Sequence, residues 1–412
     1  MIGLILGILM FMLLVLAHEF GHFISAKKSG VKVLEFGIGI PPKVCKLRTD
    51  KSGTEYTLNL LPLGWFVRLK GEDPKDEEDF NAKDSFIKAT MWKKIIILVA
   101  GVGANFVLAW ALFTIVFTFG TRPISLIPEN AMPEWVHSYL MPTKTFLYQQ
   151  WYISEELKNS IERMPVTVDW VLPDMIWEKI GLQTWDVIES INGEQINAWN
   201  IETILKNISW WALDIKYTRK SRSIDGKWAC EKDATCVLWI AFSYTGISSS
   251  DLTKLNADVI KFPFNQAMLM SLKEVWAQTK LTFSALWSLG KNLVSFDSSR
   301  VKWALNKLTG PVGAVKFGWS LLDAWGWKLF LAFAGMISLA LAIFNVLPIP
   351  ALDWGRLLWV LIQGIGKLKP EKYFTIEWYL NLFFFVLLMG LGVYIILKDL
   401  VRFRGVHIPF LG

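Results

Sequence analysis

The chain has 412 residues, 53% of them hydrophobic, and a formal net charge of +7. So apolar a composition argues against an ordinary soluble enzyme and favours a membrane protein, with the lipid bilayer as its first partner. The basic residues flank hydrophobic segments and form no cluster interleaved with aromatic side chains, so we expect no nucleic-acid partner.

Four hydrophobic segments are long enough to span a bilayer, since about 20 apolar residues cross its hydrocarbon core. They comprise residues 2–26, 95–119, 329–347 and 378–397. The first segment lacks the basic start and the small-residue cleavage site of a secretory signal peptide, so we interpret it as a span. The expected fold class is a multi-pass α-helical membrane protein.

Basic residues beside these spans predict the orientation. Lys27, Lys28 and Lys32 follow the first span, and Lys93 and Lys94 precede the second. The positive-inside rule therefore places this loop in the cytoplasm and the polar region between the second and third spans outside. Basic residues between the third and fourth spans agree, whereas those after the fourth span favour the opposite orientation.

The pattern of hydrophobic and turn residues divides the chain into five parts. Residues 1–120 and 327–412 hold two spans each, 121–163 form an external segment of unknown role, 164–245 form a small α+β domain, and 246–326 form an external helical region. Within the small domain we predict strands at 166–171, 186–191 and 212–218 and helices at 173–180 and 201–207.

The external helical region carries an amphipathic pattern. Its apolar residues recur at helical spacing, at Leu269, Leu272, Trp276, Phe283 and Leu286. Charged residues between them argue against a simple span. The helix is expected near the membrane surface, and packing against the small domain is an equal alternative.

The first span contains the run His18-Glu19-Phe20-Gly21-His22. Two histidines four residues apart on a helix point the same way, so both can bind one tetrahedral metal ion, and the carboxylate beside them can act as a general base on water. Buried core histidines are the alternative. Because ionisable groups in lipid are energetically costly, three of them within five residues favour a zinc hydrolase.

A carboxylate is expected as the third ligand, because the other two histidines lie in predicted external segments. Two prolines, Pro348 and Pro350, end the third span, and Asp353 follows them. By the predicted orientation it lies at the same membrane depth as His18 and His22. A solvated carboxylate at a helix end is the alternative, and we predict a zinc ligand.

Several motifs in order resemble the site-2 protease family of intramembrane zinc metalloproteases, most of all its regulator-of-sigma-E type with a PDZ domain. They are the intramembrane His-Glu-x-x-His, the Asn-x-x-Pro-x-Pro-x-x-Asp run at 345–353, the PDZ-like signature at 181–193, and the stretches 100–106 and 310–313. The resemblance implies Zn²⁺ as the cofactor, His18, His22 and Asp353 as its ligands, and Glu19 as the general base.

The resemblance also implies how a substrate is held. Asn345 would contact the substrate backbone, and a membrane-associated β-hairpin after the first span would include Gly64, Trp65 and Phe66. Such a strand edge holds a peptide in extended form, in which its bonds are open to attack. The substrate would be a single-span membrane protein already trimmed by another protease. The PDZ-like domain would bind extended peptides, with a structural spacer as the alternative.

Three tryptophans, Trp65, Trp185 and Trp354, stand where the family motifs have glycine. Glycine is used where the backbone needs a positive φ or close approach, and an indole allows neither. Since the chain has 22 tryptophans, we hypothesise that its gene reads UGA as glycine and was translated with UGA as tryptophan. A genuine Trp354 would crowd the zinc site and make a catalytically impaired relative a serious alternative.

The sequence therefore predicts an intramembrane zinc metalloprotease for regulated intramembrane proteolysis in the bacterial cytoplasmic membrane. Its active site would lie near the cytoplasmic face and its PDZ-like domain outside. The alternative is a catalytically impaired scaffold that binds membrane proteins through the PDZ-like domain. A transporter would need more polar residues along the spans. The oligomeric state and the pairing of Cys230 with Cys236 stay open.

Overall fold

The structure, a computed structural model, describes residues 2–72, 82–127, 136–171, 180–207, 212–229, 242–244, 260–294, 301, 308, 310–366 and 370–404. The chain divides into two compact units, one formed by Met1–Phe119 with Phe262–Gly412 and the other by Gly120–Lys261. Residues 173–179 of a predicted helix lie outside the described residues, as do Cys230 and Cys236.

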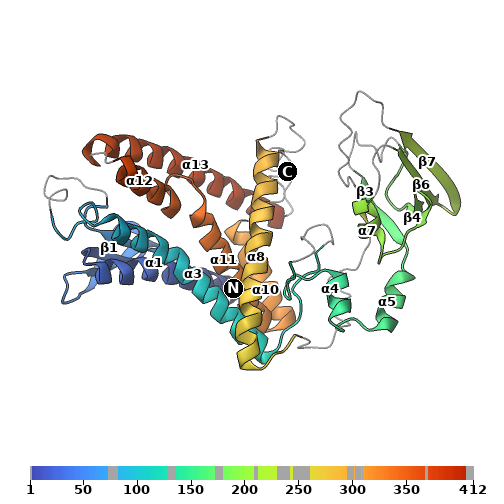
Figure 1. Cartoon of the computed structure of the whole chain (residues 1–412), viewed down its shortest axis with the longest axis horizontal. Coiled ribbons are helices and arrows are strands. Elements are labelled where there is room, and N and C mark those ends of the chain that lie inside the picture. Colours follow the sequence, from blue (N-terminus) through green and yellow to red (C-terminus); the bar gives the residue numbers. More distant parts are fainter. Residues whose placement is uncertain are drawn as a thin grey trace. The chain divides into compact units, whose positions relative to one another are not determined.

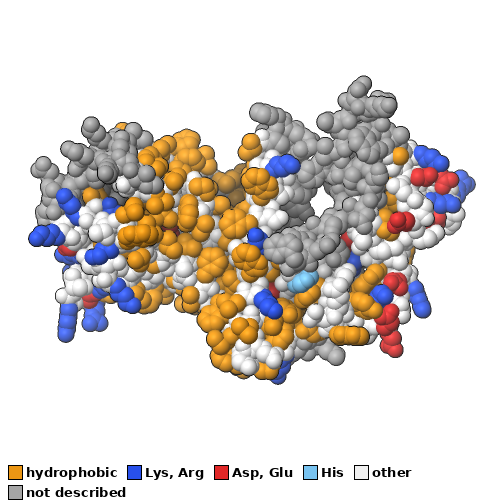
Figure 2. Space-filling view, in the orientation of Figure 1, with side chains coloured by type: hydrophobic (Ala, Val, Ile, Leu, Met, Phe, Trp, Pro, Cys, Tyr) orange, Lys and Arg blue, Asp and Glu red, His pale blue; other side chains and the backbone are white. Residues whose placement is uncertain are grey.

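Among the described residues, four helices of the first unit are long and apolar enough to cross a membrane. They are α1 (Ile2–Ser29), α3 (Met91–Phe119), α11 (Trp327–Val346) and α13 (Pro370–Arg404). All four predicted spans are thus confirmed as helices. α3 packs against both α1 and α11 (Figure 1), and hydrophobic side chains cover much of the visible surface of this helical unit (Figure 2).

Three further helices lie in the described part of the helical unit: α8 (Phe264–Leu293), α10 (Pro311–Trp325) and α12 (Asp353–Gly366). The amphipathic helix predicted from Leu269 to Leu286 is α8, and its packing partners are α3 and α11. The indole Nε1 of Trp110 donates a hydrogen bond to the carbonyl of Met268 at 3.0 Å, and the hydroxyls of Thr114 and Ser271 lie 2.7 Å apart. The sequence did not show that α8 would pack along the spans.

A long β-hairpin follows α1, as the family resemblance predicts. Strands β1 (Val33–Thr49) and β2 (Glu55–Leu69) are antiparallel, and β2 packs against α1. The strands are bent, so that the first part of β1 pairs with both the first and the last part of β2. At its tip, Asp50 accepts hydrogen bonds from the backbone N–H groups of Ser52 and Thr54, and its carboxylate pairs with Lys27 at the end of α1. The hairpin is therefore tied to the helix that carries the two histidines.

The second unit is built around a six-stranded sheet in the order β7-β6-β4-β3-β8, with β5 paired to β4. Its described elements are α4 (Lys144–Gln149), α5 (Glu155–Glu162), β3 (Val166–Val171), β4 (Val187–Ile191), β5 (Glu194–Gln195), α7 (Ile201–Asn207), β6 (Ala212–Arg219), β7 (Arg222–Ala229) and β8 (Phe242–Tyr244). The three predicted strands and the helix at 201–207 are confirmed. Apolar side chains from β3, β4, β6 and α7 form the core of this domain.

Candidate active site

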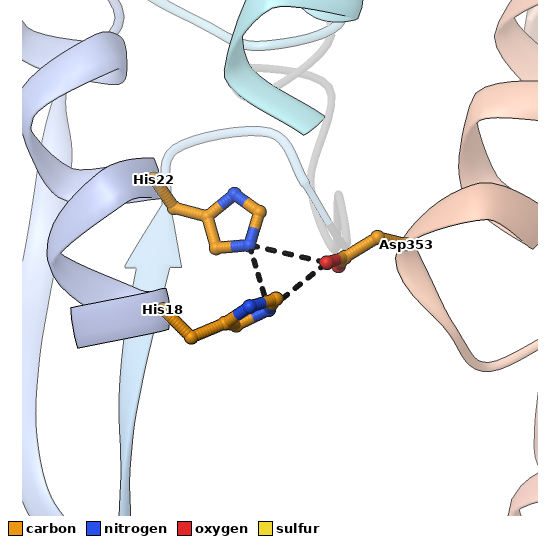
Figure 3. Close-up of side chains that lie close together, drawn as sticks. All are labelled: His18, His22 and Asp353. Atoms are coloured by element: carbon orange, nitrogen blue, oxygen red, sulfur yellow. Dashed lines mark hydrogen bonds and ion pairs between the residues drawn. The ribbon is translucent and has the colours of Figure 1, made fainter. Parts of the chain in front are cut away.

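Three side chains from distant parts of the sequence converge in the helical unit (Figure 3). His18 and His22 lie one turn apart on α1, and Asp353 is the first residue of α12. The carboxylate Oδ2 of Asp353 lies 3.0 Å from His18 Nε2 and 3.3 Å from His22 Nε2, and these two nitrogens lie 3.2 Å apart. The structure brings together all three residues that the sequence predicts as ligands.

This triangle has the size of one face of a tetrahedral zinc site. Bonds of about 2.0–2.2 Å to nitrogen and carboxylate oxygen hold tetrahedral ligand atoms about 3.3 Å apart. Oδ2 of Asp353 is buried and makes no hydrogen bond of regular geometry within the described chain, although it lies close to both rings. Two imidazoles and one carboxylate leave the fourth position for water or substrate, so the donor set fits catalytic zinc.

The other ring nitrogens meet polar groups on α3. His22 Nδ1 lies 2.8 Å from the carbonyl oxygen of Ile97, which can only accept, so Nδ1 carries the proton and Nε2 keeps its lone pair. His18 Nδ1 lies 3.4 Å from the buried amide of Asn105, and the backbone carbonyl of Asn105 accepts a hydrogen bond from Ser338 at 3.0 Å. Both imidazole rings are therefore oriented by polar contacts at Nδ1, the nitrogen that does not face Asp353.

Two glycines allow α1 and α3 to come this close. A Cβ atom on Gly101 would lie 2.2 Å from His22 Nε2, and one on Gly21 would lie 2.3 Å from the carbonyl oxygen of Ala100. A larger residue at position 101 would displace the imidazole from the triangle. The stretch 100–106 thus has a physical role that the sequence alone did not reveal.

The turn before Asp353 is held in place by two contacts. Pro348 and Pro350 follow the end of α11, and Ala351 then adopts φ 76°. The side-chain oxygen of Asn381 on α13 accepts a hydrogen bond from the N–H of Ala351 at 3.1 Å. One helical turn beyond Asp353, Arg356 pairs with Glu72, which follows the hairpin. These contacts fix the position of the carboxylate.

Glu19, the predicted general base, contacts the hairpin. Its carboxylate accepts a hydrogen bond from the backbone N–H of Val67 in β2 at 3.1 Å. It is also close enough to His18, His22 and Asp353 to interact with them electrostatically. The base is therefore held between the ligand cluster and a strand.

The predicted substrate contacts lie around this cluster. Gly64, Trp65 and Phe66 precede Val67 in β2, and Trp65 lines an apolar cavity of about 930 Å³ together with residues of α1, α3, β1 and α11. Asn345 lines a small cavity with Asp353 and Trp354, and its amide nitrogen donates to the carbonyl of Leu341 in its own helix.

Trp354 does not separate the proposed ligands. Its side chain is 37% exposed, and it lines the small cavity beside Asp353. The three donor atoms nevertheless lie 3.0–3.3 Å apart. The expected crowding therefore does not disrupt the triangle.

A comparison with known proteins identifies the family. The model of "Peptidase family M50" matches residues 6–389. The chain belongs to peptidase family M50. This is the site-2 protease family, so the predicted membership is confirmed and the chain is an intramembrane zinc metalloprotease.

Similar proteins from bacteria cover almost the whole M50 chain. A "putative zinc metalloprotease" of Clostridium perfringens is 28% identical over an alignment of 404 residues, which covers 96% of this chain and 98% of the relative. The "regulator of sigma E protease" of Haemophilus influenzae is 26% identical, covering 94% and 96%. The protein of that name from Salmonella typhimurium LT2 is 27% identical, covering 92% and 95%. These bacterial relatives and the four apolar helices fit an inner-membrane protein.

Proposed function

We propose that His18, His22 and Asp353 bind the zinc ion of this M50 peptidase and that Glu19 is its general base. The observation that carries the proposal is the triangle of donor atoms, whose sides of 3.0–3.3 Å suit one tetrahedral ion. Zinc held there supplies Lewis-acid activation of water and of the scissile carbonyl.

The chain's own residues move the proton. Glu19 accepts it from the attacking water and then delivers it to the departing amine, as in other enzymes with this motif. The backbone N–H of Val67 orients the carboxylate for both steps. His18 and His22 stay neutral ligands, because each needs a lone pair on Nε2.

We further propose that the substrate is the transmembrane segment of a single-span membrane protein, trimmed beforehand by another protease. A transmembrane helix must unwind locally before its peptide bonds are open to attack. The edge of β2 around Gly64, Trp65 and Phe66 would hold the unwound segment as an added strand, with Asn345 as a second backbone contact.

The proposed orientation places this site near the cytoplasmic face and the small domain outside. Residues 164–245 would act there as a PDZ-like domain that binds extended peptide at a sheet edge. Its PDZ-like signature and its small sheet with helix α7 support that assignment. A purely scaffolding role is not favoured, because the ligand cluster and Glu19 are assembled.

Metal analysis of the purified full-length protein tests the ligand assignment. His22→Ala and Asp353→Ala should each lose both bound zinc and the cleavage of a pre-trimmed single-span substrate. Asp323→Ala, an exposed carboxylate on α10, should change neither. Stoichiometric zinc in His22→Ala or Asp353→Ala would refute the assignment.

A further inference from the structure

Trp151 occupies a backbone position that favours glycine. Its φ is 62° and its side chain is 91% exposed. The N–H of Trp151 donates to the carbonyl of Tyr148 at 3.0 Å, and the N–H of Tyr152 donates to that of Leu147 at 2.9 Å. This pair of bonds is the Schellman motif, which ends a helix with a left-handed residue that is usually glycine.

The end of α1 provides an internal comparison. There the N–H of Gly30 donates to Lys27 at 3.2 Å and that of Val31 donates to Ala26 at 3.0 Å. Gly30 has φ 78°, so the same motif at the end of α1 uses glycine. Trp151 takes the place of that glycine at the end of α4.

Trp185 occupies a second position of this kind. It is the third residue of a turn closed by a 3.2 Å hydrogen bond from the N–H of Asp186 to the carbonyl of Gln183. Its φ is 74° and its side chain is 76% exposed. Turns with positive φ at the third residue place glycine or asparagine there, because a bulky side chain is strained.

The other non-glycine residues with positive φ in the described part of the chain are smaller or flexible. They are Asn192, Lys220, Ser221 and Ala351. The two tryptophans are the aromatic residues in this group, and neither gains burial in exchange for the strain. Packing therefore does not explain why they are tryptophan.

Tryptophan is well accommodated elsewhere in the same chain. Trp110 donates its indole N–H to the carbonyl of Met268 at 3.0 Å. The indole Nε1 of Trp65 in β2, by contrast, is buried without a hydrogen-bond partner among the described residues. Trp65 and Trp354 also stand where the family motifs have glycine. The 22 tryptophans thus include residues with favourable indole contacts and residues at glycine positions.

We propose that the natural protein carries glycine at positions 65, 151, 185 and 354, each encoded by a UGA codon that its host reads as glycine. Position 151 lies in no family motif, and its backbone conformation alone identifies it as a glycine position. Positions 151 and 185 lie in the second unit, Gly120–Lys261, and not in the unit that carries the ligand cluster, so the proposal stands independently of the proposed catalytic roles.

Glycine at the other two positions would change the substrate path. Without the indole of Trp65, the apolar cavity beside β2 is larger and an incoming strand can approach the backbone more closely. Without the indole of Trp354, the small cavity shared by Asp353 and Asn345 is more open. The active site with glycine at both positions is then more open than the active site of the tryptophan-containing chain.

The codons of the source gene give the primary test. We expect UGA at positions 65, 151, 185 and 354 and UGG at position 110, and mass spectrometry of the protein from its own host should find glycine at the first four. UGG at both 151 and 185 would overturn the proposal. Tryptophan in the corresponding host peptides would overturn it as well.

The stability of full-length protein in detergent tests the conformational argument separately. The double variant Trp151→Gly/Trp185→Gly should have an unfolding temperature about 2–4 °C above that of the tryptophan-containing protein, because both changes relieve strain at positive φ. Trp110→Gly, which removes a packed and hydrogen-bonded indole, should unfold at a lower temperature. If the double variant unfolds at a lower temperature than the tryptophan-containing protein, the assignment of glycine to these two positions is wrong.

Discussion

The backbone N–H of Val67 in β2 donates a hydrogen bond to the carboxylate of Glu19 in α1, with a donor–acceptor distance of 3.1 Å. This bond joins the proposed general base to the strand that is proposed to hold the substrate. Placement of the base and placement of the scissile peptide bond thus depend on one element. A shift of β2 along α1 would move both.

Val67→Pro tests this link, because proline removes the N–H donor while an edge strand can tolerate it. We expect cleavage to slow by about 10-fold or more with zinc content unchanged, since the base loses orientation and not the metal. Val67→Ala keeps the donor and is the matched control. Equal rates in the two variants would show that the bond does not position Glu19.

Asn105 should hold His18 in the protonation form that binds zinc. In the structure, Nδ2 of the Asn105 amide lies 3.4 Å from His18 Nδ1. With Nε2 facing the metal, Nδ1 of His18 carries a proton, so the amide must turn to present its oxygen to Nδ1. That oxygen otherwise has no hydrogen-bond partner in the described structure. Asn105→Ala should weaken zinc binding by about 10–100-fold in chelator competition. Unchanged affinity would exclude this role for Asn105.

Asn381 should stabilise the turn that presents Asp353. Ala351 has φ 76°, a conformation that costs an L-residue about 1–2 kcal/mol. The side-chain oxygen of Asn381 accepts a hydrogen bond from the N–H of Ala351. Asn381→Ala should lower zinc affinity by about 10-fold. Ala351→Gly should keep the affinity and stabilise the fold by about 0.5–1 kcal/mol. A loss of affinity in Ala351→Gly alone would contradict this account of the turn.

Asp50 should make the attachment of the hairpin dependent on pH. Partial burial alone would raise the pKa of this carboxyl, but the ammonium of Lys27 and hydrogen bonds from Ser52 and Thr54 outweigh it and hold the pKa below its ordinary value. A depressed folded-state pKa gives stability that is present above the unfolded-state pKa of about 3.9 and is lost as the pH falls toward the folded-state pKa.

Thermal unfolding at several pH values checks that expectation. The difference in stability between the wild type and Asp50→Asn should be constant above about pH 5 and should shrink below about pH 4, because Asp50 then takes up a proton in the unfolded state while it is still ionised in the folded state. Glu55→Gln, at the start of β2 and paired with Lys43, tests whether any hairpin carboxylate has this effect. A stability difference that grows as the pH falls would contradict the predicted pH dependence.

The sequence predicted the parts of the site that local geometry determines. Helical spacing alone aligns His18 with His22, and two prolines mark the end of the span before Asp353. The sequence did not identify the roles of Asn105, Asn381 and the Val67 N–H. Each of these depends on the rotation or register of an element that is distant in the chain.

The sequence also did not predict which helices pack against one another. The amphipathic pattern of α8 showed that one face would be covered but did not show that α3 and α11 would cover it. Trp151 gave no signal in the sequence, because only its positive φ distinguishes it from other exposed tryptophans. The domain boundaries within 121–326 stay predictions.

The most direct test of the central claim compares Glu19→Gln with the wild type. Full-length protein is co-expressed with a pre-trimmed single-span substrate, and cleavage and bound zinc are measured together. We predict stoichiometric zinc in both proteins, cleavage by the wild type, and a loss of about 100-fold or more in Glu19→Gln. Cleavage by Glu19→Gln at the wild-type rate would contradict the assignment of Glu19 as the general base.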